Sequence, residues 1–320
     1  MRKLFTIAQN TLTETLRQPI YAIIIAAAIL LFILSPALTM YTMSDDDKLL
    51  REIGLSTLFL TSLFVAIFSA SGAVAEELEN KTITTVLSKP VQRPVFIVAK
   101  FLGVGAAVVI AHYICTIALL MTIRHGVLDS ASDARDWTVV AAAATALAGA
   151  ILFGTFFSFV FGWKFSSAFV VLSGIFATLG IIFLAFIYPH WTFNPPANGL
   201  QALDIYGALL LLFAALVMTA LAIAFSSRFN IVVTLSACVG IFLLGLISDY
   251  IFGRFADAHL WARIAWFILP NLQVFWISDA IYEESQIPGR YIMIAGSYAL
   301  CYVGAILAFS VGLFQRRQVG

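Results

Sequence analysis

Charge is scarce in this sequence, and its scarcity decides the class of protein. Of the 320 residues only 11% are charged, whereas 62% are hydrophobic. Soluble globular domains have roughly 25% charged and 45–50% apolar residues. The composition therefore excludes an ordinary water-soluble domain and predicts an integral membrane protein. Because backbone polar groups in lipid must be satisfied within their own segment, the expected fold class is all-α.

Cysteine and recognisable catalytic motifs are also scarce. Cys115, Cys238 and Cys301 each lie in an apolar run, which predicts buried thiols without a disulfide framework. There is no G-x-x-x-x-G-K-[ST], so we expect no ATP-binding P-loop, and no H-E-x-x-H, which argues against a zinc protease. Three of the four histidines are scattered near the expected outer ends of spans: His125, His190 and His259. We therefore expect no catalytic residue, no metal site and no bound cofactor.

Long apolar runs dominate what is present. A membrane-spanning helix needs about 20 consecutive, mostly apolar residues. Eight segments meet this requirement approximately: 19–42, 54–75, 96–122, 138–162, 168–188, 205–225, 230–252 and 291–314. The sequence thus predicts one membrane domain over 19–320 with about eight transmembrane helices.

Residues 1–18 precede the first span and have a different pattern. Their apolar positions recur at helical spacing, and polar side chains occupy the remaining positions. The apolar positions are Leu4, Ile7, Ala8, Leu12 and Leu16. This pattern predicts an amphipathic helix that lies in the membrane surface and ends before Pro19.

The distribution of basic residues predicts the orientation of the chain. Cytoplasmic loops carry an excess of Lys and Arg. With the N-terminus inside, the inner segments hold 11 of the 18 basic residues but only four acids, and eight spans return the C-terminus to the inside. The inner basic residues are Arg2, Lys3, Arg17, Lys81, Lys89, Arg93, Lys100, Lys164, Arg228, Arg316 and Arg317. Both termini are expected in the cytoplasm.

Two further segments are notable. Residues 253–289 are rich in Trp, Tyr and charge, which predicts short amphipathic helices at the outer surface, broken at Pro270. Residues 165–187 and 225–247 align without gaps. An internal repeat would explain that alignment, but two spans that enter from the cytoplasm with the same Ser-Ser start explain it as well, and we favour the second explanation.

His112 is expected deep in the third span, about 12 residues beyond Lys100 and roughly 18 Å along a helix. An ionisable group at that depth is by default a functional candidate, here for a transport path. The alternative, slightly favoured, is a neutral histidine that is bonded to a neighbouring helix. No Asp, Glu, Lys or Arg falls clearly at mid-membrane, which argues against an ion-coupled carrier.

The stretch AEELENKTITTVLSKPVQRPVFIVAK interrupts the apolar sequence between the second and third spans. Glu76 and Glu77 follow the second span, and Glu77 can pair with Lys81 one helical turn later. Thr82 is a plausible cap for a short helix over 82–88 that ends before Pro90. The apolar face of that helix comprises Ile83, Val86 and Leu87.

This series resembles the coupling loop of type 2 ABC permeases, a family of bacterial exporter subunits. The family pattern runs Glu, Gly/Lys-Thr, Leu, Pro, Arg and Lys. The matching positions in this sequence are Glu77, Lys81-Thr82, Leu87, Pro90, Arg93 and Lys100. The basic surface helix at the N-terminus and the outer segment before the last span extend the resemblance. Members of the family often have six spans, whereas this chain has eight candidates.

The resemblance implies a multi-pass permease in the bacterial plasma (inner) membrane. Such a subunit works as a homodimer or heterodimer, in contact with membrane lipid and without nucleic acid, and pairs with a separate ATPase that binds the ATP. The 76–95 loop would dock on that ATPase. A membrane-embedded enzyme or maturation factor with a site in 253–289, and an ion-coupled secondary carrier, remain alternatives.

Overall fold

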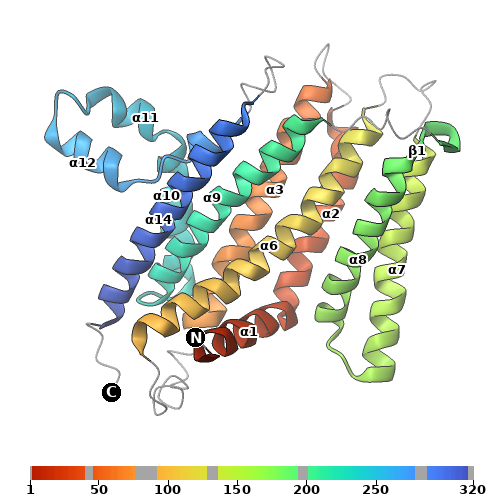
Figure 1. Ribbon diagram of the computed structural model, residues 1–320, viewed down its shortest axis with the longest axis horizontal. Coiled ribbons are helices and arrows are strands. Elements are labelled where there is room, and N and C mark those ends of the chain that lie inside the picture. The colour runs from red at the N-terminus through yellow and green to blue at the C-terminus, as the bar shows by residue number, and fades with distance from the viewer. Residues whose placement is uncertain are drawn as a thin grey trace.

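The computed structural model describes residues 2–39, 46–75, 92–127, 136–193, 201–277 and 287–315. Within these ranges the chain forms a bundle of long helices (Figure 1). The long helices are α1 (Arg2–Arg17), α2 (Pro19–Thr39), α3 (Asp46–Ala70), α6 (Arg93–His125), α7 (Trp137–Phe161), α8 (Phe165–Phe186), α9 (Ala202–Ser226), α10 (Ile231–Leu246) and α14 (Gly289–Gln315). The predicted all-α class is confirmed.

The shorter elements lie at helix ends. A π-turn, η1 (Ser71–Ala75), extends α3, and two-residue strands β1 (Ile187–Tyr188) and β2 (Thr192–Phe193) pair antiparallel around η2 (Pro189–Trp191). The segment after α10 holds α11 (Ser248–Ile251), η4 (Gly253–Phe255), α12 (Leu260–Ile268) and η5 (Gln273–Phe275).

Seven described helices are long and apolar enough to cross a membrane, and α10 with α11–η4 forms an eighth span if the bent pair counts as one. The bend is 64°, so the predicted span over 230–252 breaks near Ile247 instead of continuing straight. The sequence alone did not reveal this break, because the apolar run continues through it.

The packing of α9 against α14 favours eight crossings. Gly296 lies beside Phe213, and Arg228 donates to the Leu313 carbonyl, so residue numbers rise together along the two helices. The two helices are therefore parallel (Figure 1). Because parallel spans require a return crossing between them, α10 and the segment after it must bring the chain back across the bundle.

Burial divides the bundle into central and peripheral helices. Of the apolar part of α3 and of α9, 67% is buried, against 22% for α7 and α8. The α7–α8 hairpin stands at one side of the bundle in Figure 1, while α3, α6 and α9 lie in its interior. The central helices are thus the ones whose side chains face protein on most sides.

The predicted N-terminal helix is confirmed as α1, which ends at Arg17 before α2 begins at Pro19. It packs closely on the first turns of α6, because a Cβ added at Gly103 would lie 2.6 Å from the Ala8 carbonyl oxygen and 2.6 Å from the Thr11 Cβ. We call the end of the bundle that carries α1 the α1 end, and the opposite end the far end.

The segment after α10 is fastened to α14. Three tyrosines of α14 bond to its backbone: Tyr291 donates to the Val274 carbonyl at 2.6 Å, Tyr302 donates to the Ile268 carbonyl, and Tyr298 accepts from the Asn271 N–H at 3.0 Å. Helix α12 ends at Ile268, so the predicted break at Pro270 is confirmed; proline disfavours helical backbone in the residue before it.

Two further expectations from the sequence need correction, one about the cysteines and one about the aligned stretches. Cys115 and Cys238 are buried, but Cys301 is exposed, as is its neighbour Leu300 on α14. The aligned stretches 165–187 and 225–247 also differ in structure. Phe165 begins α8, whereas Phe225 lies in the last turn of α9 and α10 starts only after Asn230, which caps it. The two Ser pairs therefore occupy different places, one inside α8 and one at the end of α9, so the predicted shared Ser-Ser start is wrong.

Replacing Gly103 with Ala should separate α1 from α6. The added Cβ meets backbone and a short side chain, neither of which can move cheaply, so we expect a loss of about 1–3 kcal/mol in stability. Gly304→Ala is the matched control, because nothing lies within 4 Å of its Cβ and helix propensity favours Ala. Thermal unfolding in detergent measures both; an unfolding temperature unchanged in Gly103→Ala would contradict the close packing.

Candidate functional site

Most of the predicted coupling loop lies outside the described residues. This applies to Glu76, Glu77, Lys81, Thr82, Ile83, Val86, Leu87 and Pro90. The described residues on either side show where the loop begins and ends. Gly72, just before it, lies against the Gln18 side chain, and Gly103, just after it, lies against α1. Both flanks of the loop are therefore at the α1 end.

Arg93 and Lys100 belong to the first turns of α6. Arg93 is its first residue, and Pro94 suits this position because the first turn lacks intrahelical acceptors for its N–H groups. Lys100, the last position of the predicted loop pattern, is only 3% exposed, and its Nζ lies 5.6 Å from the centre of the Phe96 ring. Lys100 thus contributes to the packing of α6.

His112 is buried between three helices. Its Nδ1 lies 2.8 Å from Ser62 Oγ on α3, and its Nε2 lies 2.8 Å from the Ala208 carbonyl oxygen on α9. A carbonyl can only accept, so Nε2 carries a proton and donates. In the neutral ring Nδ1 then accepts the Ser62 hydroxyl proton. Both ring nitrogens are used to join α3, α6 and α9.

An ion pair joins α3 to α9 nearer the far end of the bundle. Arg51 Nε on α3 is 3.0 Å from Asp204 Oδ1 on α9, and the Asp204 side chain is 1% exposed. Asp204 also lies in the first turn of α9, where the helix dipole favours a negative charge. Asp204 and Ala208 are one helical turn apart, so the ion pair and the histidine hold α3 to α9 at successive levels.

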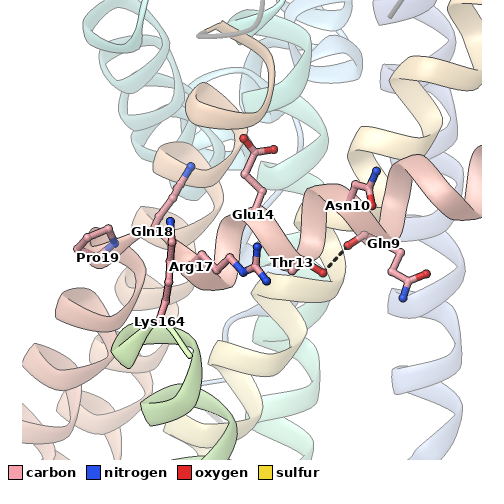
Figure 2. Close-up of a pocket in the computed structure, with 8 residues that line it drawn as sticks. All are labelled: Gln9, Asn10, Thr13, Glu14, Arg17, Gln18, Pro19 and Lys164. Atoms are coloured by element: carbon pink, nitrogen blue, oxygen red, sulfur yellow. Dashed lines mark hydrogen bonds between the residues drawn. The ribbon is translucent and has the colours of Figure 1, made fainter. Parts of the chain in front are cut away.

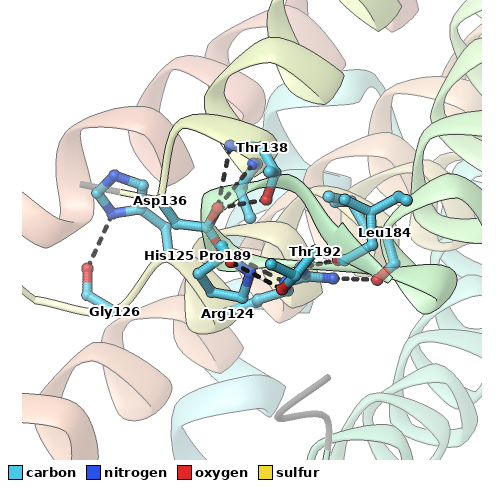
Figure 3. A network of polar contacts seen from close by, with 10 residues as sticks. Arg124, His125, Gly126, Asp136, Thr138, Leu184, Pro189 and Thr192 are labelled. Atoms are coloured by element: carbon cyan, nitrogen blue, oxygen red, sulfur yellow. Dashed lines mark hydrogen bonds and ion pairs between the residues drawn. The ribbon is translucent and has the colours of Figure 1, made fainter. Parts of the chain in front are cut away.

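Arg124 joins α6 to the peripheral α7–α8 hairpin (Figure 3). Its guanidinium donates to the carbonyls of Leu184 and Ile187 at the end of α8, and its Nε lies 3.5 Å from Asp136 Oδ2. Asp136 also caps α7, since its other oxygen accepts from the N–H groups of Thr138 and Val139. One arginine thus joins the end of α6 to both peripheral helices.

Hydrogen bonds also connect α6 to α2. The Tyr21 hydroxyl donates to the Ala107 carbonyl at 2.7 Å, and the Thr122 hydroxyl lies 3.2 Å from the Phe32 carbonyl. Together with the contacts of His112 and Arg124, these bonds link α6 to five helices along its length. Helix α6 is therefore the element through which a movement at the α1 end can reach the far end.

The sequence did not identify the two ion pairs. Arg51, Arg124, Asp136 and Asp204 all lie near the ends of apolar segments, where charges normally meet water and headgroups. The partners are far apart in the chain, so no local spacing links them. Among the described residues, no group of three or more His, Cys, Asp or Glu side chains is arranged to hold a metal ion.

Replacing His112 with Phe should weaken the association of α3, α6 and α9. Phe keeps a ring of similar size but loses both hydrogen bonds, so the stability should fall by about 1–3 kcal/mol. Tyr113→Phe is the control, because this neighbouring residue is exposed and loses one surface contact to Thr178. Thermal unfolding of the purified variants compares them; equal unfolding temperatures would contradict a stabilising role for His112.

Replacing Asp204 with Asn should leave the Arg51 charge without its partner. Breaking a buried ion pair from one side costs about 3–5 kcal/mol. Asp257→Asn, at an exposed position of the far end, controls for the loss of one acid. Denaturation of both variants in the same detergent gives the comparison. Adding Arg51→Gln to Asp204→Asn should recover part of the loss, and no recovery would argue against a direct pair.

Comparison with known families addresses the class of protein. Residues 5–162, about half of the chain, match the family model described as "ABC-2 family transporter protein". No curated protein matches the sequence significantly. The matched range includes most of α1, the predicted loop and all of α6 and α7.

The family match and the fold agree. The match covers the predicted coupling loop and most of the N-terminal helix, two of the segments that carry the resemblance to type 2 ABC permeases, and the described residues form a multi-pass bundle of membrane-spanning helices. The chain belongs to the ABC-2 family of transporter proteins and is an ABC-2 type permease, the membrane-spanning part of an ABC transporter.

Proposed function

We propose that this permease is driven by a separate ATPase subunit that docks on the 76–95 loop at the α1 end, and that it exports its substrate. ATP is bound by that partner, and the permease supplies the path through the membrane. The observation that carries the proposal is the position of the loop flanks. Both lie at the end where α1 packs on the start of α6.

Helix α6 provides the mechanical connection. It has 33 residues and is about 50 Å long, and its first three residues are the last three of the predicted 76–95 loop. A helix of this length moves as a stiff rod, because its backbone hydrogen bonds continue along it. A push at Arg93 would therefore reach the His112 contacts and then Arg124, shifting α3, α9 and the α7–α8 hairpin together.

The orientation follows from the basic residues. Arg17, Arg93 and Lys164 lie at the α1 end, as does Arg228 at the end of α9. By the positive-inside rule this end faces the cytoplasm, where a soluble ATPase is found. We place both termini on that side and the protein in the bacterial plasma membrane.

A second permease chain, identical or different, would complete the transporter. Large apolar side chains of α2 remain exposed in the single chain, including Ile23, Leu30 and Leu34. In the membrane these face lipid or another permease subunit. We propose a dimer of permeases with two ATPase subunits.

The alternative of an enzyme on the outer segment gains no support from the residues described there. The carboxylate of Asp249 accepts from Trp266 Nε1 at 2.6 Å and from Asn271 Nδ2 at 2.8 Å. These contacts hold α11 to α12 and to the segment that follows α12, so Asp249 has a structural role. The permease proposal accounts for more of the chain.

Replacing Leu87 with Asp should release the ATPase. A charge on the apolar face of the predicted loop helix would have to be desolvated on docking, which costs several kcal/mol. Co-purification from detergent-solubilised membranes, followed by mass spectrometry, should show a stoichiometric ATPase with the wild type and about tenfold less with Leu87→Asp. Leu87→Met is the control and should retain the ATPase. Full retention by a folded Leu87→Asp protein would refute docking through this face.

A further inference from the structure

A groove of about 810 Å³ lies at the α1 end, between α1 and the turn that joins α7 to α8 (Figure 2). Side chains from three elements line it, and nearly all are polar. They are Gln9, Asn10, Thr13, Glu14, Arg17, Gln18, Pro19 and Lys164. A lining of amides, a hydroxyl and charged groups suits a polar, charged ligand.

Two cationic side chains enter the groove from separate parts of the chain. Arg17 comes from the last turn of α1 and Lys164 from the turn before α8. Ser166 fixes this arrangement, because its hydroxyl donates to the Arg17 carbonyl at 3.0 Å. Within the described ranges neither charged group has a hydrogen-bond or ion-pair partner. Two such cations in one groove attract an anion between them.

The groove lies at the boundary between polar and apolar surface. Pro19 is the first residue of α2, and Lys164 directly precedes Phe165, the first residue of α8. Next to Lys164 the aromatic side chains of Phe161 and Trp163 are 60% and 51% exposed. Exposed aromatic residues beside Lys at the ends of spans mark the headgroup level. An anion at this level is a phospholipid phosphate.

Apolar surface continues from the groove into the span. Ile20 and Ile23, in the first turns of α2, are 37% and 64% exposed, so they offer a surface for acyl chains directly beyond Pro19. The groove also contains an acid, Glu14, one helical turn before Gln18. A ligand with a phosphate, an amine and two acyl chains matches all of these features.

We propose that this groove binds one phospholipid with an amine-bearing headgroup. Arg17 and Lys164 hold its phosphate, and Glu14 faces its ammonium group. The planar guanidinium of Arg17 can donate two parallel N–H bonds to phosphate oxygens, while Lys164 supplies a mobile point charge. Bound there, the lipid would connect α1 to the α7–α8 hairpin.

Native mass spectrometry of the full-length, delipidated protein tests this proposal by titration with phosphatidylethanolamine. We expect one tightly bound lipid in the wild type. The double variant Arg17→Ala/Lys164→Ala should bind it about tenfold more weakly or worse, because charge-assisted bonds are lost. Arg2→Ala removes a charge from the same helix outside the groove and should leave the affinity unchanged.

Two further variants test the chemistry and guard against misfolding. Arg17→Lys/Lys164→Arg keeps both charges and should bind the lipid within about threefold of the wild type. Glu14→Gln should bind phosphatidylethanolamine and phosphatidylglycerol equally, whereas the wild type should prefer the former.

Three results would overturn the proposal. One is equal lipid affinity in the wild type and the double alanine variant. Another is equal weakening by Arg2→Ala, which would indicate a general effect of charge. The third is displacement by soluble glycerophosphoethanolamine at the same concentration as the lipid, which would show that the acyl chains contribute nothing and that the ligand is a free phosphate compound.

Discussion

A polar side chain inside a lipid-embedded bundle must find its hydrogen-bond partner within the protein, because lipid offers none. This constraint organises the structure around α6. His112 forms hydrogen bonds to α3 and α9. Arg124 forms hydrogen bonds to α8 and an ion pair with Asp136, which precedes α7. The Ala107 carbonyl of α6 accepts a hydrogen bond from Tyr21 of α2. Hydrophobic attraction alone is non-directional, whereas hydrogen bonds and ion pairs require defined partners. The polar contacts fix their register.

The same contacts give the permease a route for conformational change. Helix α6, which follows the predicted coupling loop, is bonded to five other helices, so under the proposed function docking at the α1 end and rearrangement at the far end would be parts of one movement. Each hydrogen bond between helices in a membrane contributes only about 0.5–2 kcal/mol to stability. Several such bonds along α6 are together weak enough that the proposed ATP-driven cycle could rearrange them.

Much of this fold follows from the sequence, for identifiable reasons. Apolar runs predicted the span over 96–122, observed as α6, and prolines marked the breaks at Pro19 and Pro270. Which helices are central was not predictable, because lipid and protein interior are both apolar. Spans α2 and α9 have mean hydropathies of 2.6 and 2.7, yet 28% of one and 67% of the other is buried. The depth of His112 was predicted, but its partners on α3 and α9 depend on tertiary packing.

The most direct test of ATPase docking at the α1 end is photocrosslinking in intact cells. A photoreactive amino acid placed at Gln92, where the loop meets α6, should crosslink to an ABC ATPase, whereas the same probe at Gly126, at the far end of α6, should not. Crosslinking of the ATPase from Gly126 instead, or the absence of any ATPase adduct at Gln92 in an active transporter, would contradict the proposed arrangement.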